Sequence, residues 1–315
     1  INIKMVIEGE EECGSKGLFA VLPQKEDELK ADHIVIVDMG MPGKDTPAIT
    51  LGCRGIATFG ITLNCSNADL HSGTHGGVVY NPLHALVEIL SKLRDENGKV
   101  TVPHFYDDVV EMSTEEKNEL ALQSFDESDY EKEFGTKATG GEKDLPPLVS
   151  AWCRPTLEIN GIWGGYNQEG FKTVIPAKSF AKISMRLVPN QDPEKILEDT
   201  IAYLKTLLPK GVSLEVDYRS TPFPAVRCSS SSKIATAASQ AYEKVFEKPC
   251  QKILGGGSIP IATLLAKHAK AEPLLIGTAL DTDKIHSPNE HFLLECFEKG
   301  FLMITQLIEQ LEKDH

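Results

Sequence analysis

Apolar residues near the start of the chain come in short, dense runs separated by polar segments. Residues 2–8 (NIKMVIE) and 33–40 (HIVIVDMG) predict two buried strands, and GSKGLFAVL between them predicts a helix with Ser15 as a candidate N-cap. A strand, a helix and a second strand in this order are typical of an α/β sheet.

The pattern changes after about Thr50. GIATFGITLNCS alternates as a half-exposed antiparallel strand does, and NPLHALVEILSKL carries apolar residues at helical spacing. A polar, acidic stretch at 106–143 predicts a solvated surface excursion with short helical pieces. Beyond it, a strand, a helix and a strand complete a small α+β unit: KSFAKISMRLV, EKILEDTIAYLKTLL and VSLEVDYRS.

Segments from residue 233 onward return to the α/β pattern and end in the amphipathic helix ECFEKGFLMITQLIEQLEK. We therefore predict one α/β domain, made of residues 1–53 and 223–315, that is interrupted by an inserted α+β domain at 54–222. A chain of 315 residues is long enough for two such cores.

Charge and cysteine usage narrow the possible partners. The 32 basic and 46 acidic residues give a formal charge of −14, which disfavours nucleic acid and anionic membranes and favours small ligands or metal cations. Seven cysteines occur without a C-x-x-C pair, which is typical of a reducing compartment, and no apolar run approaches the roughly 20 residues of a membrane span. We expect a cytoplasmic protein.

Carboxylates and a histidine follow three predicted strands. Glu11 and Glu12 end the first strand, where extended backbone points neighbouring side chains to opposite sides, so that one binds a cation and the other faces a reacting atom. A solvated acidic turn is an equal alternative. Asp38 ends the next strand and His286 follows the apolar run PLLIGTALD; each alone reads as structural, but together they form a donor set that zinc accepts.

Three further segments carry candidate binding residues. His71 lies in the loop NADLHSGTHGG, where hydrogen bonding to a ligand is a better interpretation than a metal pair with His75. Arg186 lies mid-strand among apolar residues and needs an anionic partner, either a structural carboxylate or a substrate. The loop GGGSIP, with Gly257 and Ser258, precedes a helix and can present N–H groups to an anion, but it lacks the lysine and spacing of a P-loop.

The chain resembles the cocatalytic zinc metallopeptidase family that contains the aminoacylases and carnosinases (M20), in particular its cytosolic non-specific dipeptidase branch. The pieces that carry the resemblance are EGEEECGS, Asp38, LGCRGI, ADLHSG, KTVIPAK, ISMRLVPN, GGGSIP and HSPNE. The resemblance implies a mixed-sheet, phosphorylase/hydrolase-like catalytic domain and an inserted lid domain through which two copies form a homodimer. It also implies two divalent metal ions, Zn or Mn, and small peptide substrates.

The resemblance also assigns roles to residues. It makes Glu11 the general base, Glu12 a metal ligand, Asp38 a ligand of one metal and His286 a ligand of the other. His71 matches a lid histidine that reaches into the partner's active site. The remaining matches hold the substrate, chiefly its terminal carboxylate: Thr173, Arg186, Gly257 and Ser258.

Two departures from the family pattern affect the functional prediction. The family's H-x-D motif and its metal-bridging aspartate have no match here, and we expect them in an N-terminal segment outside this chain. Cys13 stands where the pattern has serine. We expect a metallodipeptidase; the alternatives are an N-acyl amino acid deacylase with the same residues, and a catalytically incompetent fragment or oligomerising module.

Overall fold

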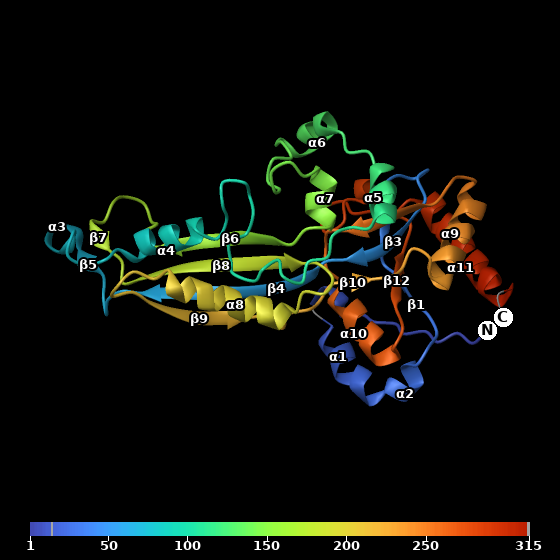
Figure 1. Cartoon of the computed structure of the whole chain (residues 1–315), viewed down its shortest axis with the longest axis horizontal. Coiled ribbons are helices and arrows are strands. Elements are labelled where there is room, and N and C mark those ends of the chain that lie inside the picture. Colours follow the sequence, from blue (N-terminus) through green and yellow to red (C-terminus); the bar gives the residue numbers. More distant parts are fainter. Residues whose placement is uncertain (14, 314–315) are drawn as a thin grey trace. The chain divides into compact units, whose positions relative to one another are not determined.

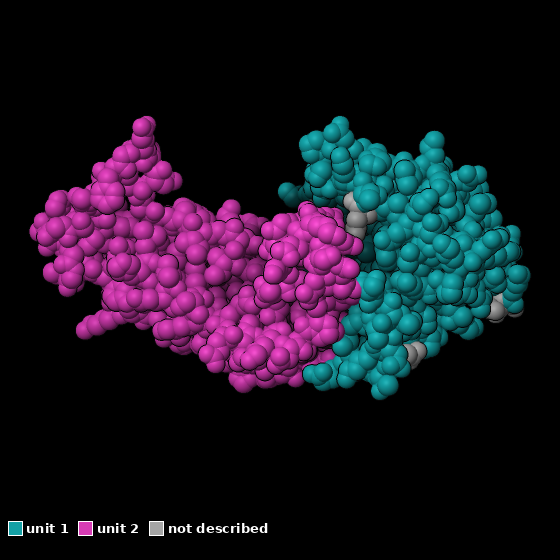
Figure 2. Space-filling view, turned by 90° about the horizontal axis from the view of Figure 1, so that it is seen from above, with its two compact units in different colours: residues 1–54, 111–124, 225–315 teal, residues 55–110, 125–224 magenta. Residues whose placement is uncertain are grey.

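The computed structural model describes residues 1–13 and 15–313, which form two compact units (Figure 1). Unit 1 contains residues 1–54, 111–124 and 225–315, and unit 2 contains residues 55–110 and 125–224 (Figure 2). The sequence led us to keep 54–222 together, whereas in the structure the segment 111–124 packs with unit 1.

A five-stranded mixed sheet forms the centre of unit 1. Its order is β1-β12-β3-β10, with β11 also paired to β3; β1 runs parallel to β12, β11 runs parallel to β3, and β10 is antiparallel to β3. The strands are β1 (Ile34–Val37), β3 (Ala48–Cys53), β10 (Val226–Arg227), β11 (Gln251–Gly255) and β12 (Pro273–Ile276). The short strands β2 (Gly40–Met41) and β13 (Ala279–Leu280) pair in parallel beyond β1 and β12.

Helices cover both faces of this sheet. Successive side chains of a strand point to opposite faces of the sheet. On one face, α9 (Lys233–Phe246) and α11 (Leu294–Lys313) pack against Leu274 and Ile276 of β12. On the other face, α10 (Pro260–Ala269) buries Ala262 beside Leu275. The short helices α1 (Lys16–Val21) and α2 (Glu26–Leu29) precede β1. The predicted α/β class is confirmed.

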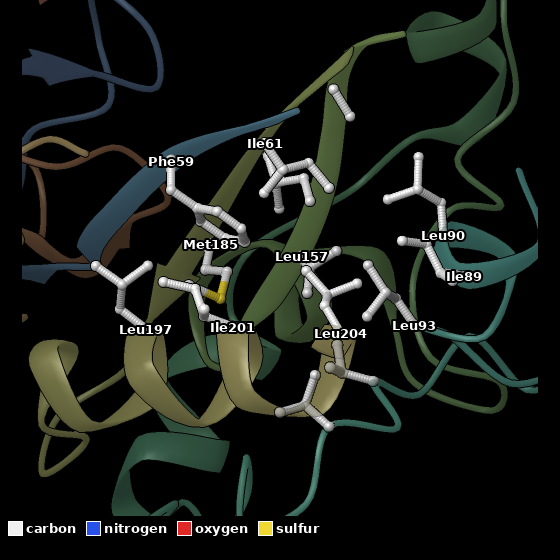
Figure 3. Close-up of a cluster of buried hydrophobic side chains, with 14 of the residues drawn as sticks. Phe59, Ile61, Ile89, Leu90, Leu93, Leu157, Met185, Leu197, Ile201 and Leu204 are labelled. Atoms are coloured by element: carbon white, nitrogen blue, oxygen red, sulfur yellow. The ribbon is translucent and has the colours of Figure 1, made fainter. Parts of the chain in front are cut away.

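Unit 2 is an antiparallel sheet with helices on one face. Its order is β6-β8-β4-β9, formed by β6 (Thr156–Gly164), β8 (Lys178–Leu187), β4 (Gly55–Asn64) and β9 (Ser213–Arg219). Alternate residues of β4 and β8, such as Phe59 and Met185, pack against α4 (Pro82–Ser91) and α8 (Pro193–Thr206) (Figure 3). The period-two pattern of the sequence thus predicted the buried face.

Several short elements extend unit 2. β5 (Leu70–His71) pairs with β7 (Val174–Ile175), and α3 (Ser72–His75) follows β5 at one end of the unit (Figure 1). The helix α6 (Glu127–Phe134) belongs to the acidic excursion, and α7 (Pro147–Trp152) follows it. Arg154 holds this region through two hydrogen bonds to Glu142, at 2.8 Å and 3.1 Å, with its guanidinium 5.1 Å from the ring centroid of Tyr106.

The helix α5 (Thr114–Ala121) is the part of the excursion that packs on unit 1. A capping box between Ser113 and Glu116 starts the helix. Glu119 then lies 3.3 Å from the ammonium of Lys252 on β11, and Glu116 lies 3.8 Å from Arg227 on β10. The sequence suggested that this piece of the acidic stretch is solvated. In the structure it is a helix that packs on unit 1.

The predicted first strand is wrong. Residues 2–8 have no regular structure, and Met5 and Ile7 are 79% and 86% exposed. An apolar run becomes a strand only where a neighbouring strand accepts its hydrogen bonds, and none of the described residues does so here. Ser15 does precede α1, but it has a φ of 52° and its side chain makes no capping hydrogen bond. In the part of the chain that the structure describes, no helix is long and apolar enough to span a membrane.

Candidate metal centre

Asp38 lies where the parallel strands β1 and β12 end together. The backbone N–H groups of Asp38 and Met39 both donate to the carbonyl of Ile276, each at 3.0 Å. Two chain segments therefore leave the sheet side by side, and they continue as β2 and β13. The prediction that Asp38 follows a strand is confirmed.

His286 is carried by the second of these segments. It follows β13 and a 3-10 turn, in a left-handed conformation with φ of 60°. Asp283 stabilises the preceding turn, because its buried carboxylate accepts a hydrogen bond from the N–H of Leu280 at 2.9 Å while its carbonyl accepts from His291. The Nε2 atom of His286 lies 3.0 Å from Oε1 of Glu12, a residue 274 positions earlier.

Glu11 and Glu12 occupy a 3-10 turn, Glu11–Cys13, and not the extended strand end that we predicted. Glu10 holds the turn: its carbonyl accepts from the N–H of Cys13 at 3.0 Å, and its carboxylate accepts from the N–H of Gly17 at 3.0 Å. Extended backbone therefore does not separate the two side chains, and both lie close to Asp38 or His286.

The electrostatics of these groups show that they are neighbours. Burial raises the pKa of Glu11, and the negative charges of Glu12 and Asp38 raise it further. Burial likewise raises the pKa of Asp38, with a second contribution from Glu12. The hydrogen bond to Glu12 raises the pKa of His286. Three carboxylates in one place favour a cation beside them.

The donor types fit a divalent metal, since zinc accepts carboxylate oxygen and imidazole nitrogen and manganese prefers oxygen. Within residues 1–13 and 15–313, however, no group of three or more His, Cys, Asp or Glu side chains has the spacing to hold one ion. Glu12 and His286 contact each other directly. The residue types at this place suit a metal site, but among the described residues their arrangement is not that of a complete one.

The glycine-rich loop lies next to this cluster. It joins β11 to α10, and a Cβ atom on Gly255 would lie 3.7 Å from the methyl group of Met39, the residue after Asp38. Arg54 fixes the loop, because its backbone N–H donates to Gly257 at 3.0 Å and its Nε donates to Gly256 at 2.8 Å. Ser258 follows directly. Arg54 had no predicted role, although it lies in the motif LGCRGI that contributed to the resemblance.

The other predicted binding residues belong to unit 2. His71 pairs with Val174 in the β5–β7 ladder, its Nδ1 accepts from the N–H of Gly73 at 3.1 Å, and the carbonyl of Thr173 accepts from Ser72. His71 and Thr173 are thus neighbours. Arg186 lies near the far end of β8, paired with Ile56 and Thr156, so the structure does not bring it to His71.

Comparison with known proteins identifies the class. The model of the peptidase dimerisation domain of the M20 peptidases matches residues 51–212, about half of the chain. The chain belongs to the M20 peptidase family.

Particular relatives are similar over nearly the whole chain. It is 31% identical to Cys-Gly metallodipeptidase dug1 of Schizosaccharomyces pombe, over 99% of this chain and 66% of that protein. It is 32% identical to human Beta-Ala-His dipeptidase, over 92% and 58% respectively. The solved structure of the di-peptidase Dug1p from Saccharomyces cerevisiae superposes with a TM-score of 0.79 and 28% identity, covering 97% of this chain and 65% of that one. The chain therefore spans less than two thirds of the length of these relatives.

Proposed function

We propose that the protein containing this chain hydrolyses dipeptides in a reaction that depends on two divalent metal ions, Zn or Mn. The observation that carries the proposal is the contact between His286 and Glu12, which joins distant segments beside Glu11 and Asp38. Membership of the M20 family and the dipeptidase names of the relatives support the substrate class.

The roles follow from the surroundings of each group. Glu12 and Asp38 with His286 would hold the metal, which supplies positive charge that polarises the substrate carbonyl and acidifies water. Glu11 accepts the proton of the attacking water and returns it to the leaving amine.

Five residues bind the substrate in this proposal. Arg186, Gly257 and Ser258 bind the terminal carboxylate of the dipeptide, and His71 stabilises the oxyanion that develops on the carbonyl. Thr173, the neighbour of His71, binds the substrate from the same copy as His71. Two copies form a homodimer, so that the His71 of one copy serves the site of the other. The description of residues 51–212 as a dimerisation domain supports this arrangement.

Turnover of a substrate panel tests the proposal. We expect hydrolysis of dipeptides with a free C-terminal carboxylate, loss of activity with a metal chelator, and recovery on addition of Zn²⁺ or Mn²⁺. The natural protein should hydrolyse dipeptides with an amidated C-terminus slowly. Arg186→Ala should lower the hydrolysis rate of these amidated dipeptides little further. Faster cleavage of N-acetyl amino acids would identify a deacylase instead, and chelator-resistant turnover would contradict the metal role.

A further inference from the structure

Tyr242 is a fully buried side chain of α9 that the proposed chemistry does not use. Its hydroxyl donates to the carbonyl of Gly277 at 2.8 Å and accepts from the N–H of the same residue at 3.0 Å. One side chain thus satisfies both backbone groups of a single residue. Burial raises the pKa of Tyr242, so the hydroxyl keeps the proton that it donates.

Gly277 is the residue that follows β12, opposite Asp38 and Met39. A Cβ atom on Gly277 would lie 1.8 Å from the carbonyl oxygen of Met39 and 2.6 Å from its nitrogen, so only glycine permits this approach of two backbones. Before this point the N–H of Asp38 donates to Ile276, and after it the N–H of Ala279 donates to Met39 at 3.4 Å. The segments that carry Asp38 and His286 run side by side in parallel here and approach each other closely at Gly277 and Met39.

We propose that Tyr242 is a positioning residue that fixes this close approach of the two segments, and with it the placement of Asp38 and of the segment leading to His286. The proposal rests on the proposed function for its metal, and on the two hydrogen bonds to Gly277 for its geometry. Without the hydroxyl, both polar groups of Gly277 lose a partner in a buried place, and the two segments separate more easily. Hydrogen bonds that orient metal-ligating residues commonly tune metal affinity by 10- to 100-fold.

The test is Tyr242→Phe, which removes the hydroxyl and keeps the ring that stacks on Phe246. Tyr106→Phe is the matched control, because the Tyr106 hydroxyl also accepts a backbone N–H, that of Val100 at 3.0 Å, but in unit 2. Amide hydrogen exchange resolved to single residues by NMR and Zn²⁺ affinity by competition with a chromophoric chelator are measured for both variants and the natural chain.

We expect Tyr242→Phe to speed exchange at Gly277, Asp38 and Met39 by about tenfold or more relative to the β3 amides, and to weaken Zn²⁺ binding by about tenfold or more. Tyr106→Phe should change neither quantity, even if both variants melt at similarly lowered temperatures. Unchanged exchange at Asp38 and Met39, or equal loss of Zn²⁺ affinity in both variants, would overturn the proposal. If the protein containing this chain binds no Zn²⁺ but the local exchange effect is present, the metal function fails while the positioning of the two segments by Tyr242 stands.

Discussion

The separation of His71 and Arg186 within unit 2 makes a quantitative prediction about the assembled enzyme. His71 lies at the end of the unit where β8 begins with Lys178, and Arg186 lies eight residues further along that strand. At about 3.3 Å per residue the two ends are roughly 26 Å apart. A dipeptide spans only about 7 Å, so one copy of unit 2 cannot bring both side chains to one substrate.

The perturbation is a mixture of two inactive proteins, His71→Ala and Arg186→Ala. Removing one oxyanion-stabilising group typically costs about 10²–10³ in kcat, so the His71→Ala homodimer should retain on the order of 1% activity or less. In a mixed dimer, the site on the His71→Ala subunit keeps its own Arg186 and receives His71 from its partner. The other site lacks both. Random exchange makes about half of the dimers mixed, with one good site of two, so activity should recover to roughly a quarter of that of the natural protein.

The assay is dipeptide turnover by the mixture after reversible dissociation, with subunit exchange followed by a mass or affinity tag on one variant. Each variant incubated alone through the same cycle is the control. No recovery despite demonstrated mixed dimers would mean that both residues serve the same copy or that one of them is outside catalysis, and the reasoning from strand length would be refuted.

Three further outcomes can be checked separately. Glu11→Gln should lower kcat by about 10²–10⁴ with metal content unchanged by atomic absorption, and loss of metal would show that Glu11 is a ligand. Glu142→Ala removes the two hydrogen bonds that this carboxylate accepts from Arg154 at a largely buried site, and should lower the free energy of unfolding by about 2–3 kcal/mol in urea titrations; a change below about 0.5 kcal/mol would contradict this. Burial raises the pKa of Cys250 to about 12, so iodoacetamide at pH 8 should label the exposed Cys13 well before Cys250 in native protein, as mass spectrometry would show.

Sequence patterns predicted the elements whose hydrogen bonds are local or whose buried face has a clear period. The alternation in β4 and the helical spacing of α8 and α9 identified the sides that pack in the two cores. The end of β1 at Asp38 was equally readable, because an apolar run stops at a carboxylate. The prediction of a strand at residues 2–8 was wrong for the opposite reason. Their apolar pattern is typical of a strand, but strand pairing depends on a neighbouring strand that the local sequence does not specify.

The sequence allowed us to predict which residues form the candidate site, but not the backbone conformation that holds them. Glu11, Glu12, Asp38 and His286 could be named from motifs, but the 3-10 turn that carries the glutamates depends on the contacts of Glu10. Tyr242 looked like any apolar position of an amphipathic helix, and nothing in the segment KIATAASQAYEKVF indicates that its hydroxyl meets Gly277, 35 residues later.

The docking of α5 on unit 1 affects how the inserted domain can be transplanted. The chain passes between the units after residues 54, 110, 124 and 224, four times where a simple insertion passes twice. A continuous piece 55–224 would carry α5 without the surfaces of β10 and β11 that neutralise Glu116 and Glu119. A version of the domain that folds by itself should instead join residue 110 to residue 125 with a short polar linker. The unit that can be transplanted therefore consists of two separate stretches of chain, 55–110 and 125–224.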